Sequence, residues 1–209
     1  MIPAVTDFDA EAGTWDEQPG RLDRARTVAQ EIRRTVPLTR EMAALEYGAG
    51  TGLLGRQLAG DLASITFADA SAGMTEVATA TIARLGAADT MRAVRLDLMT
   101  DPVPEERYDL VLSMMALHHV DDIPALLAAF HTLLREGGRL ALVDLDAEDG
   151  SFHEGDFAGH HGFARDALAA QLEEAGFAEV GFRTAYTVSK EVDGQARDFP
   201  LFLATARRD

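Results

Sequence analysis

Short apolar runs that alternate with helical patterns are the feature that most limits how this chain can fold. Apolar runs at 42–47, 64–68, 91–96, 108–115 and 139–146 are separated by segments whose apolar residues recur at helical spacing. Strands that alternate with helices of this length form βαβ units, which build a parallel sheet covered by helices on both faces. We therefore expect a doubly wound α/β sheet, in which Glu136 to Gly138 end the helix that precedes the fifth strand.

The pattern changes after the helix that we expect to end at Gly176. Apolar and polar residues alternate roughly over 180–188, Asp193-Gly194 is typical of a hairpin turn, and an apolar run returns at 199–206. The predicted fold class is α/β, with a mostly parallel seven-stranded sheet that ends in a C-terminal antiparallel hairpin.

Composition and charge exclude several classes of function. The 209 residues are 47% hydrophobic, which is enough for the core of one medium-sized domain. The absence of cysteine excludes disulfides, thiolate zinc sites and cysteine nucleophiles. A net charge of −16 opposes sequence-independent binding to nucleic acid or anionic lipid, so a small neutral or cationic partner is favoured.

The sequence also bears on localisation. No segment approaches the roughly 18 consecutive apolar residues of a membrane-spanning helix. Residues 1–10 contain two aspartates and no basic residue, which does not resemble a secretory signal. We therefore expect a cytoplasmic protein without membrane insertion.

The segment LEYGAGTG, at 45–52, places alternate glycines between an apolar run and a helical pattern. Such a loop brings the backbone close to a nucleotide-like ligand. Counted from Gly48, the first glycine of the loop, the dinucleotide fingerprint G-x-G-x-x-G fails, because Leu53 stands at its last glycine position. The P-loop fails as well, because Arg56 and Gln57 stand where lysine and a hydroxyl residue are required.

The remaining pattern, E-x-G-x-G-x-G, resembles the class I S-adenosylmethionine-dependent methyltransferases. Further segments in the same order support the resemblance, which covers 45–146 in detail: FADAS, LDL, YDLVLSMMALHHV and LLREGGRLALVD. It implies a Rossmann-like methyltransferase fold and a single methyltransferase domain over 1–209. Its expected parts are an N-terminal helical cap (1–40), a cofactor-binding core (41–146), a substrate-side lid loop (147–163) and a C-terminal helix and hairpin (164–209).

The resemblance also implies roles in holding S-adenosyl-L-methionine. The loop glycines would admit the methionine part of the cofactor, with Glu46 near its ammonium group. Asp69 would accept hydrogen bonds from both ribose hydroxyls. Asp97 would hold the adenine amino group, and Met74 would pack on the adenine face. The implied cofactor-binding set is Glu46, Gly48, Gly50, Gly52, Asp69, Ala70, Met74, Asp97, Leu98, Ser113 and Met114.

The methyl acceptor is constrained mostly by exclusion. The sequence lacks the Asn/Asp-Pro-Pro-aromatic motif of enzymes that methylate adenine or glutamine amino groups, and it lacks the cysteines that cytosine-carbon and arsenic methylation require. The resemblance points to the small-molecule subgroup that includes quinone-biosynthesis enzymes. We expect methyl transfer to an oxygen, nitrogen or carbon nucleophile of a small molecule. The sequence indicates neither the identity of that molecule nor the oligomeric state of the protein.

Two stretches are expected to form the acceptor side. One is 8–16, which contains the only tryptophan, and the other is the long loop that follows the fifth strand. Histidine suits a general base because its ordinary pKa is near neutral. The candidate catalytic residues are His118, His119, His153 and His161, and the candidate substrate-pocket residues are Trp15, Phe152 and His160.

Three alternatives were weighed beside this assignment. A metal site could combine His153, His160 and His161 with Asp144, Asp146 or Glu148. Because that spacing matches no known ligand signature, no metal is predicted. The chain could instead be a catalytically inactive cofactor-binding module or partner subunit, or a protein methyltransferase that binds basic peptides.

Overall fold

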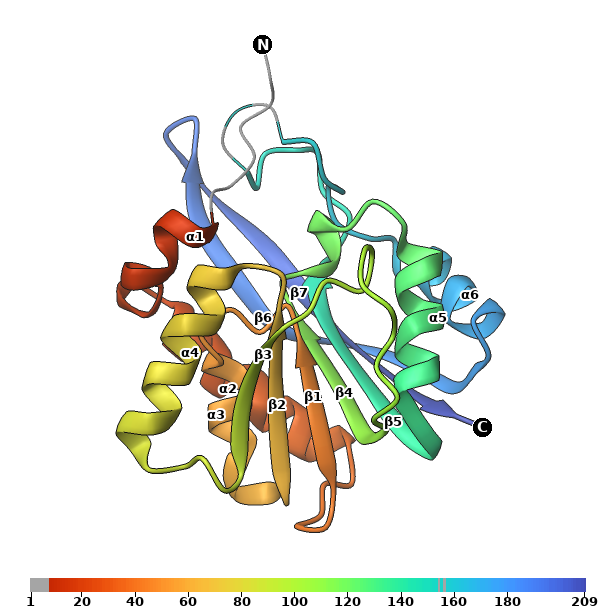
Figure 1. Cartoon of the computed structure of the whole chain (residues 1–209). Coiled ribbons are helices and arrows are strands. Elements are labelled where there is room, and N and C mark those ends of the chain that lie inside the picture. Colours follow the sequence, from red (N-terminus) through yellow and green to blue (C-terminus); the bar gives the residue numbers. More distant parts are fainter. Residues whose placement is uncertain (1–7, 154, 156) are drawn as a thin grey trace.

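The computed structural model of the chain describes residues 8–153, 155 and 157–209 (Figure 1). The expected N-terminal cap therefore falls partly, at 1–7, outside the described residues, as do positions 154 and 156 of the lid loop.

A seven-stranded sheet forms the centre of the molecule, in the order β3-β2-β1-β4-β5-β7-β6. Its strands are β1 (Ala43–Tyr47), β2 (Ser64–Asp69), β3 (Met91–Arg95), β4 (Tyr108–Met114), β5 (Leu134–Leu145), β6 (Phe177–Val192) and β7 (Gln195–Arg208). Strands β1 to β5 are parallel, whereas β7 runs antiparallel to both β5 and β6. The predicted fold class is confirmed.

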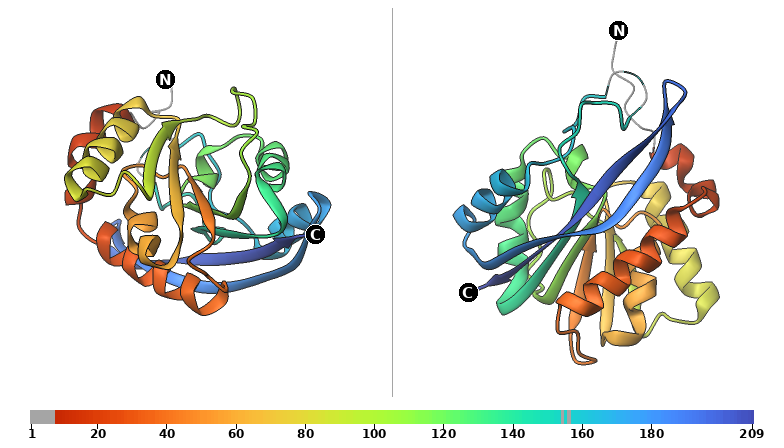
Figure 2. Two further views of the ribbon diagram at one scale, coloured as in Figure 1. Left: turned by 60° about the horizontal axis from the view of Figure 1, so that its bottom comes forward. Right: turned by 180° about the vertical axis from the view of Figure 1, so that it is seen from behind.

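Helices cover both faces of this sheet (Figure 2). The helical elements are α1 (Phe8–Glu11), η1 (Ala12–Glu17), α2 (Arg21–Thr35), α3 (Leu53–Leu58), η2 (Ala59–Asp61), α4 (Ala72–Leu85), η3 (Leu117–His119), α5 (Ile123–Leu133) and α6 (Arg165–Glu174). Helices α2 and α3 share one buried apolar cluster with the sheet, and α5 and α6 share another. Among the described residues, no helix is both long and apolar enough to cross a membrane.

Local sequence signals explain where several elements begin and end. Helix α4 starts at Ser71, whose Oγ accepts a hydrogen bond of 3.0 Å from the Met74 amide, and it ends at Gly86, where φ is 64°. The β6–β7 turn places Asp193 and Gly194 at φ values of 51° and 77°, which a two-residue hairpin turn requires.

One boundary differs from the prediction. Glu136 to Gly138 was expected to end the helix before the fifth strand, but α5 ends at Leu133 and β5 already begins at Leu134. Leu134 is fully buried and pairs with Tyr108, and the register then shifts before Leu110 pairs with Arg139. The glycines therefore lie within an irregular strand start, because tertiary pairing of Leu134 outweighs the helical pattern.

Candidate active site

The glycine loop follows β1 and leads into α3. Gly48, Gly50 and Gly52 all have positive φ, at 64°, 55° and 81°, a conformation that glycine adopts without a steric penalty. A Cβ on Gly48 would collide with the Cβ of Ala116, and a Cβ on Gly52 would lie 3.1 Å from the ring of Phe67. Packing within the protein thus requires two of these glycines, whatever ligand the loop holds.

Gly50 has different surroundings. The nearest heavy atoms to a Cβ placed there would be Nε1 of Trp15 at 3.4 Å and Sδ of Met74 at 3.8 Å. Trp15 therefore lies against the glycine loop, with the guanidinium of Arg21 over its ring at 3.2 Å from the centroid. Phe8 contacts the same indole edge-on, at a centroid distance of 5.8 Å. The segment Phe8–Glu17, here called the N-terminal segment, thus packs on the side where the cofactor was expected.

The two strand-end acids already accept backbone hydrogen bonds. Asp69 accepts two hydrogen bonds, one at each carboxylate oxygen. They come from the Gly50 amide at 2.7 Å and from the Ser71 amide at 2.9 Å. Burial raises the pKa of Asp69 despite these bonds. Asp97 accepts 2.9 Å from the Met99 amide. Each carboxylate oxygen has more than one acceptor position, so both acids keep capacity for a ligand.

Glu46 is the most deeply buried acid of the predicted set. The residue is only 2% exposed. Its carboxylate accepts a 2.8 Å hydrogen bond from the Gly55 amide in α3. Burial raises the pKa of Glu46 to about 8. Ser113, at the end of β4, is also fully buried, and its Oγ has no hydrogen-bond partner among the residues that the structure describes.

The other predicted cofactor residues lie along the same edge. The buried Leu98 amide donates a hydrogen bond of 3.3 Å to the phenol oxygen of Tyr47. The carbonyl of Ala70 accepts a hydrogen bond of 3.1 Å from Arg95 Nε. Met114 is half-buried against the apolar cluster under α2 and α3. Their contacts with a cofactor stay predictions.

His118 and Asp144 form a buried pair where β4 and β5 end side by side. His118 Nδ1 lies 2.6 Å from Asp144 Oδ1, and the two side chains are 2% and 0% exposed. The Leu145 amide donates 2.7 Å to Asp144 Oδ1, and the His118 amide donates 3.3 Å to Oδ2. The carboxylate therefore fixes the orientation of the imidazole and leaves Nε2 on the opposite side of the ring.

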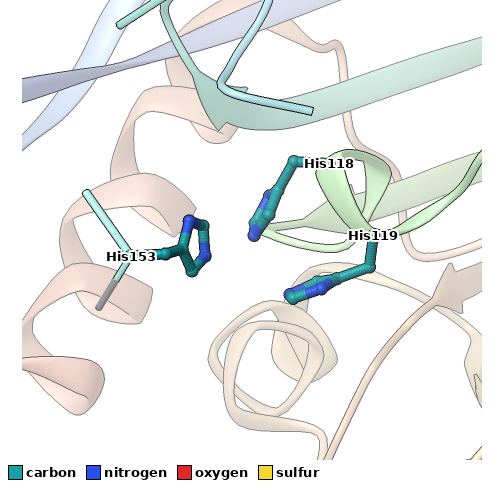
Figure 3. A group of neighbouring side chains, drawn as sticks. All are labelled: His118, His119 and His153. Carbon is teal, nitrogen blue, oxygen red and sulfur yellow. The ribbon is translucent and has the colours of Figure 1, made fainter. Parts of the chain in front are cut away.

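His119 and His153 join His118 in a compact group, here called the histidine cluster (Figure 3). One nitrogen from each ring lies within 4.8 Å of the others. Burial, followed by repulsion from the neighbouring histidines, lowers the pKa of His119 to about 3 and that of His153 to about 4. Both imidazoles are therefore neutral at pH 7.

Aromatic rings from separate segments surround the cluster. Phe157 stacks on His153 with a centroid distance of 3.7 Å and an interplanar angle of 10°, and Phe8 meets His119 edge-on at 5.2 Å. Because Phe8 contacts both Trp15 and His119, the N-terminal segment joins the glycine loop to the histidine cluster. The N-terminal segment thus brings the surroundings of Gly50 next to an aromatic, imidazole-lined group.

The remaining lid histidines lie outside the cluster. His160 Nε2 is 3.0 Å from the carbonyl of Val120, and its amide donates 2.8 Å to the carbonyl of His118. His161 is exposed, with Nδ1 3.5 Å from Glu148. Asp146 makes a bidentate pair with Arg165, at 2.7 Å for each hydrogen bond. The metal-ligand set considered from the sequence is therefore divided among separate interactions.

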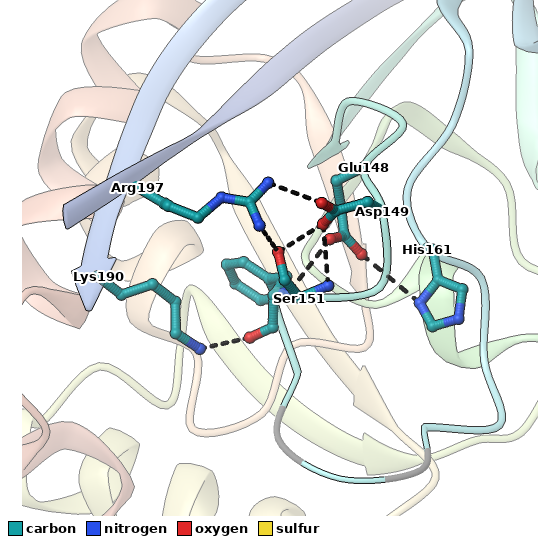
Figure 4. A network of polar contacts seen from close by, with 7 residues as sticks. Glu148, Asp149, Ser151, His161, Lys190 and Arg197 are labelled. Carbon is teal, nitrogen blue, oxygen red and sulfur yellow. Dashed lines mark hydrogen bonds and ion pairs between the residues drawn. The ribbon is translucent and has the colours of Figure 1, made fainter. Parts of the chain in front are cut away.

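A network of polar contacts joins the lid loop to the β6–β7 hairpin (Figure 4), and the carbonyl of Phe152 takes part in it. Arg197 donates hydrogen bonds to Ser151 Oγ at 2.6 Å and to Asp149 at 3.0 Å. Lys190 donates a hydrogen bond to the carbonyl of Phe152. Phe152 itself packs edge-on against Phe199, at a centroid distance of 5.3 Å. These contacts fix the position of Phe152 next to His153 in the loop.

Sequence reasoning gave no role to several residues that shape the site. Asp144 was considered only as a metal ligand, although a carboxylate inside the apolar run LALVDL must have a buried partner. Phe8 and Phe157 lay in the expected acceptor stretches without an assigned contact. Ala116 carried no signal, because its contact with Gly48 depends on how β1 and β4 lie together.

Comparisons with known proteins show the family of the chain and support its fold. A family model for a methyltransferase domain matches residues 21–180. Over 129 residues the chain is 35% identical to the hybrid PKS-NRPS synthetase mycA of Thermothelomyces thermophilus, covering 58% of this chain and 3% of that protein. Over 99 residues it is 33% identical to an uncharacterised methyltransferase of Mycobacterium tuberculosis strain H37Rv, covering 47% of this chain and 48% of that protein.

The chain thus spans a small part of the fungal synthetase and about half of the mycobacterial protein. Among solved structures, a SAM-dependent methyltransferase from Aquifex aeolicus superposes with a TM-score of 0.71 at 17% identity, covering 96% of this chain and 98% of the other. That likeness shows the fold. The family model extends over more than half of the chain, so the protein belongs to the family of methyltransferase domains that this model describes.

Proposed function

We propose that the chain binds S-adenosyl-L-methionine at the glycine loop and transfers its methyl group to a small molecule held against the histidine cluster. The observation that carries this proposal is the contact of one residue, Phe8, with both sides of the candidate site. The Gly50 side of the loop and the cluster are linked by Phe8, which contacts Trp15 and His119. The donor and acceptor sides are therefore adjacent, as a direct displacement requires.

The residues of the loop fit the cofactor. Gly50 would face the cofactor beside Trp15 and Met74, whose Nε1 and Sδ would lie 3.4 Å and 3.8 Å from a Cβ placed there. Asp69 would accept the ribose hydroxyls with its remaining lone pairs, and Asp97 would accept from the adenine amino group. The unpartnered Oγ of Ser113 supports a polar ligand atom at the end of β4. When bound, the cofactor supplies an electrophilic methyl group on a sulfonium sulfur.

The histidine cluster would serve the acceptor. The cofactor, held by the glycine loop, Asp69 and Asp97, would supply the methyl group to a lone pair of the acceptor and would leave as a neutral thioether. The acceptor's proton passes to an imidazole, for which His118 is best oriented because Asp144 holds its Nδ1. The surrounding rings of Phe8 and Phe157 exclude water from this step.

The acceptor is a small molecule, since the charge of −16 disfavours polyanions. The aromatic lining favours an acceptor with an apolar body and one nucleophilic oxygen, nitrogen or carbon.

Calorimetric titration with S-adenosylhomocysteine, with NAD and ATP titrated separately as controls, tests the cofactor side. We expect binding of S-adenosylhomocysteine alone, and its loss in Asp69→Ala. The matched control is Asp61→Ala, since Asp61 pairs with Arg33 in a surface ion pair away from the site. Thermal melting of each variant shows that it is folded.

Turnover is then tested with labelled cofactor and mixtures of phenols, amines and carbon acids, beside a panel of basic proteins. Label in a small molecule supports the proposal. Label only in the proteins would overturn the acceptor class, and binding of NAD or ATP in place of S-adenosylhomocysteine would overturn the cofactor.

A further inference from the structure

We infer that His118, His119 and His153 bind one divalent transition-metal ion, of which Zn²⁺ is the representative. Metal binding at this cluster does not depend on the proposed function. Only the use of the ion's open position, to hold the methyl acceptor, rests on that proposal.

The donor set is suited to such an ion. Three imidazoles converge, with one nitrogen of each ring within 4.8 Å of the others. Three histidines with a fourth, open position form a known arrangement for catalytic zinc. Nδ1 of His153 is buried and has no hydrogen-bond partner within the described part of the chain, so no hydrogen bond through that nitrogen opposes rotation of the imidazole.

Asp144 supplies the second, independent observation. Metal-binding histidines nearly always donate their other ring nitrogen to a carboxylate or carbonyl, which fixes the tautomer and makes the ligand more basic. The 2.6 Å contact between His118 Nδ1 and the fully buried Asp144 has this form, and it leaves Nε2 of His118 for the ion.

The required adjustment is small. Zinc–nitrogen bonds of about 2.0 Å in a tetrahedron place the three nitrogens about 3.3 Å apart. From a spread of at most 4.8 Å, rotation of two side chains is sufficient, because His119 and His153 are only half-buried whereas His118 is fixed by Asp144. The neutral-nitrogen donor set favours zinc-like ions and disfavours Mg²⁺ and Ca²⁺, which prefer oxygen.

The sequence alone did not show this site, because its donors come from two distant segments. His118 and His119 lie in η3 after β4, whereas His153 lies in the lid loop after β5. A bound ion would therefore connect the lid to the sheet edge. It would also occupy nitrogens otherwise available for proton uptake, and would polarise an acceptor hydroxyl or amine in their place.

The test uses the full chain with any histidine tag removed and metal stripped by chelator. Zn²⁺ is titrated by calorimetry, and Co²⁺ is added in parallel because tetrahedral coordination gives it visible absorption. We expect one ion per chain, a rise in melting temperature with Zn²⁺, and tetrahedral cobalt bands. His119→Ala and His153→Ala should each lower Zn²⁺ affinity by more than about 100-fold, beyond the effect typical of outer-shell changes.

His131→Gln is the matched control, because His131 lies in α5 against Phe177, outside the cluster. Its Zn²⁺ affinity should equal that of the wild type. An unaltered affinity in both cluster variants, or no binding by the wild type, would overturn the inference. His118→Ala is avoided, since it would leave Asp144 buried without its partner.

The same preparations are titrated with S-adenosylhomocysteine. If S-adenosylhomocysteine binds and Zn²⁺ does not, the metal site alone is refuted. If Zn²⁺ binds and S-adenosylhomocysteine does not, the metal site stands and the proposed function fails.

Discussion

Gly48 shows at the scale of single residues how one position can satisfy two requirements. Its φ of 64° favours glycine, and its missing side chain leaves room for Ala116. Gly48→Ala should lower the free energy of unfolding by about 2–4 kcal/mol, through backbone strain and overpacking together. Urea unfolding measures this change.

Gly60→Ala is the control for Gly48→Ala, because Gly60 has open space around its Cα and no positive φ. It should change stability by no more than about 1 kcal/mol. Adding Ala116→Gly to Gly48→Ala should restore only the packing part of the loss. Equal stability of Gly48→Ala and Gly60→Ala would show that the loop tolerates a Cβ.

Glu46 gives the protein a pH-dependent stability. Its pKa is about 8 in the folded state against 4.5 ordinarily, so between these values the folded chain keeps a proton that the unfolded chain has lost. This contribution is fully present below pH 4.5 and is lost as pH rises through about 8. Relative to wild type, Glu46→Gln should gain stability over this range, by at most about 1.4 kcal/mol per pH unit.

Urea midpoints at intervals from pH 5 to 8.5 test the Glu46 prediction. Glu41→Gln, at an exposed position before β1, controls for the lost formal charge. Parallel stability curves for Glu46→Gln and wild type would mean that Glu46 is ionised in the folded protein.

At the scale of elements, the lid loop is held to the hairpin by polar contacts, of which the Arg197–Asp149 ion pair is exposed, and by the packing of Phe152 on Phe199. Arg197→Ala removes the hydrogen bonds to Ser151 and Asp149. Amide hydrogen exchange at 148–152 should become faster, while global stability falls by less than about 1 kcal/mol, because exposed ion pairs contribute little. Arg183→Ala on β6 is the control, since Arg183 pairs with Glu31 instead. Unchanged exchange at 148–152 would show that the contacts of Phe152 with Lys190 and Phe199 hold the loop without Arg197.

The elements themselves were largely predictable, because the signals that set them are local. Ser71 and Gly86 delimit α4, and Asp193-Gly194 forms the hairpin turn, as the residue types indicate. The predicted end of α5 was wrong, because Leu134 pairs with Tyr108, which is distant in the sequence. The identity of elements therefore followed from the sequence better than their ends.

For the whole molecule, the site was predictable only in part. Asp69 and the glycine loop could be placed at one edge because parallel strands end together. The pairing of His118 with Asp144 depends on the adjacency of β4 and β5, which no local pattern encodes. The approach of His153 depends on the path of the lid loop, and that path is set by contacts with the hairpin.

The position of Trp15 has a consequence for how unfolding is observed. The only indole of the chain lies on the N-terminal segment and touches Gly50, far in sequence from most of the sheet. Its emission therefore reports whether this short segment is docked, whereas far-ultraviolet circular dichroism reports the helices and strands. Noncoincident transitions by the two probes would reveal detachment of the segment while the sheet is still intact.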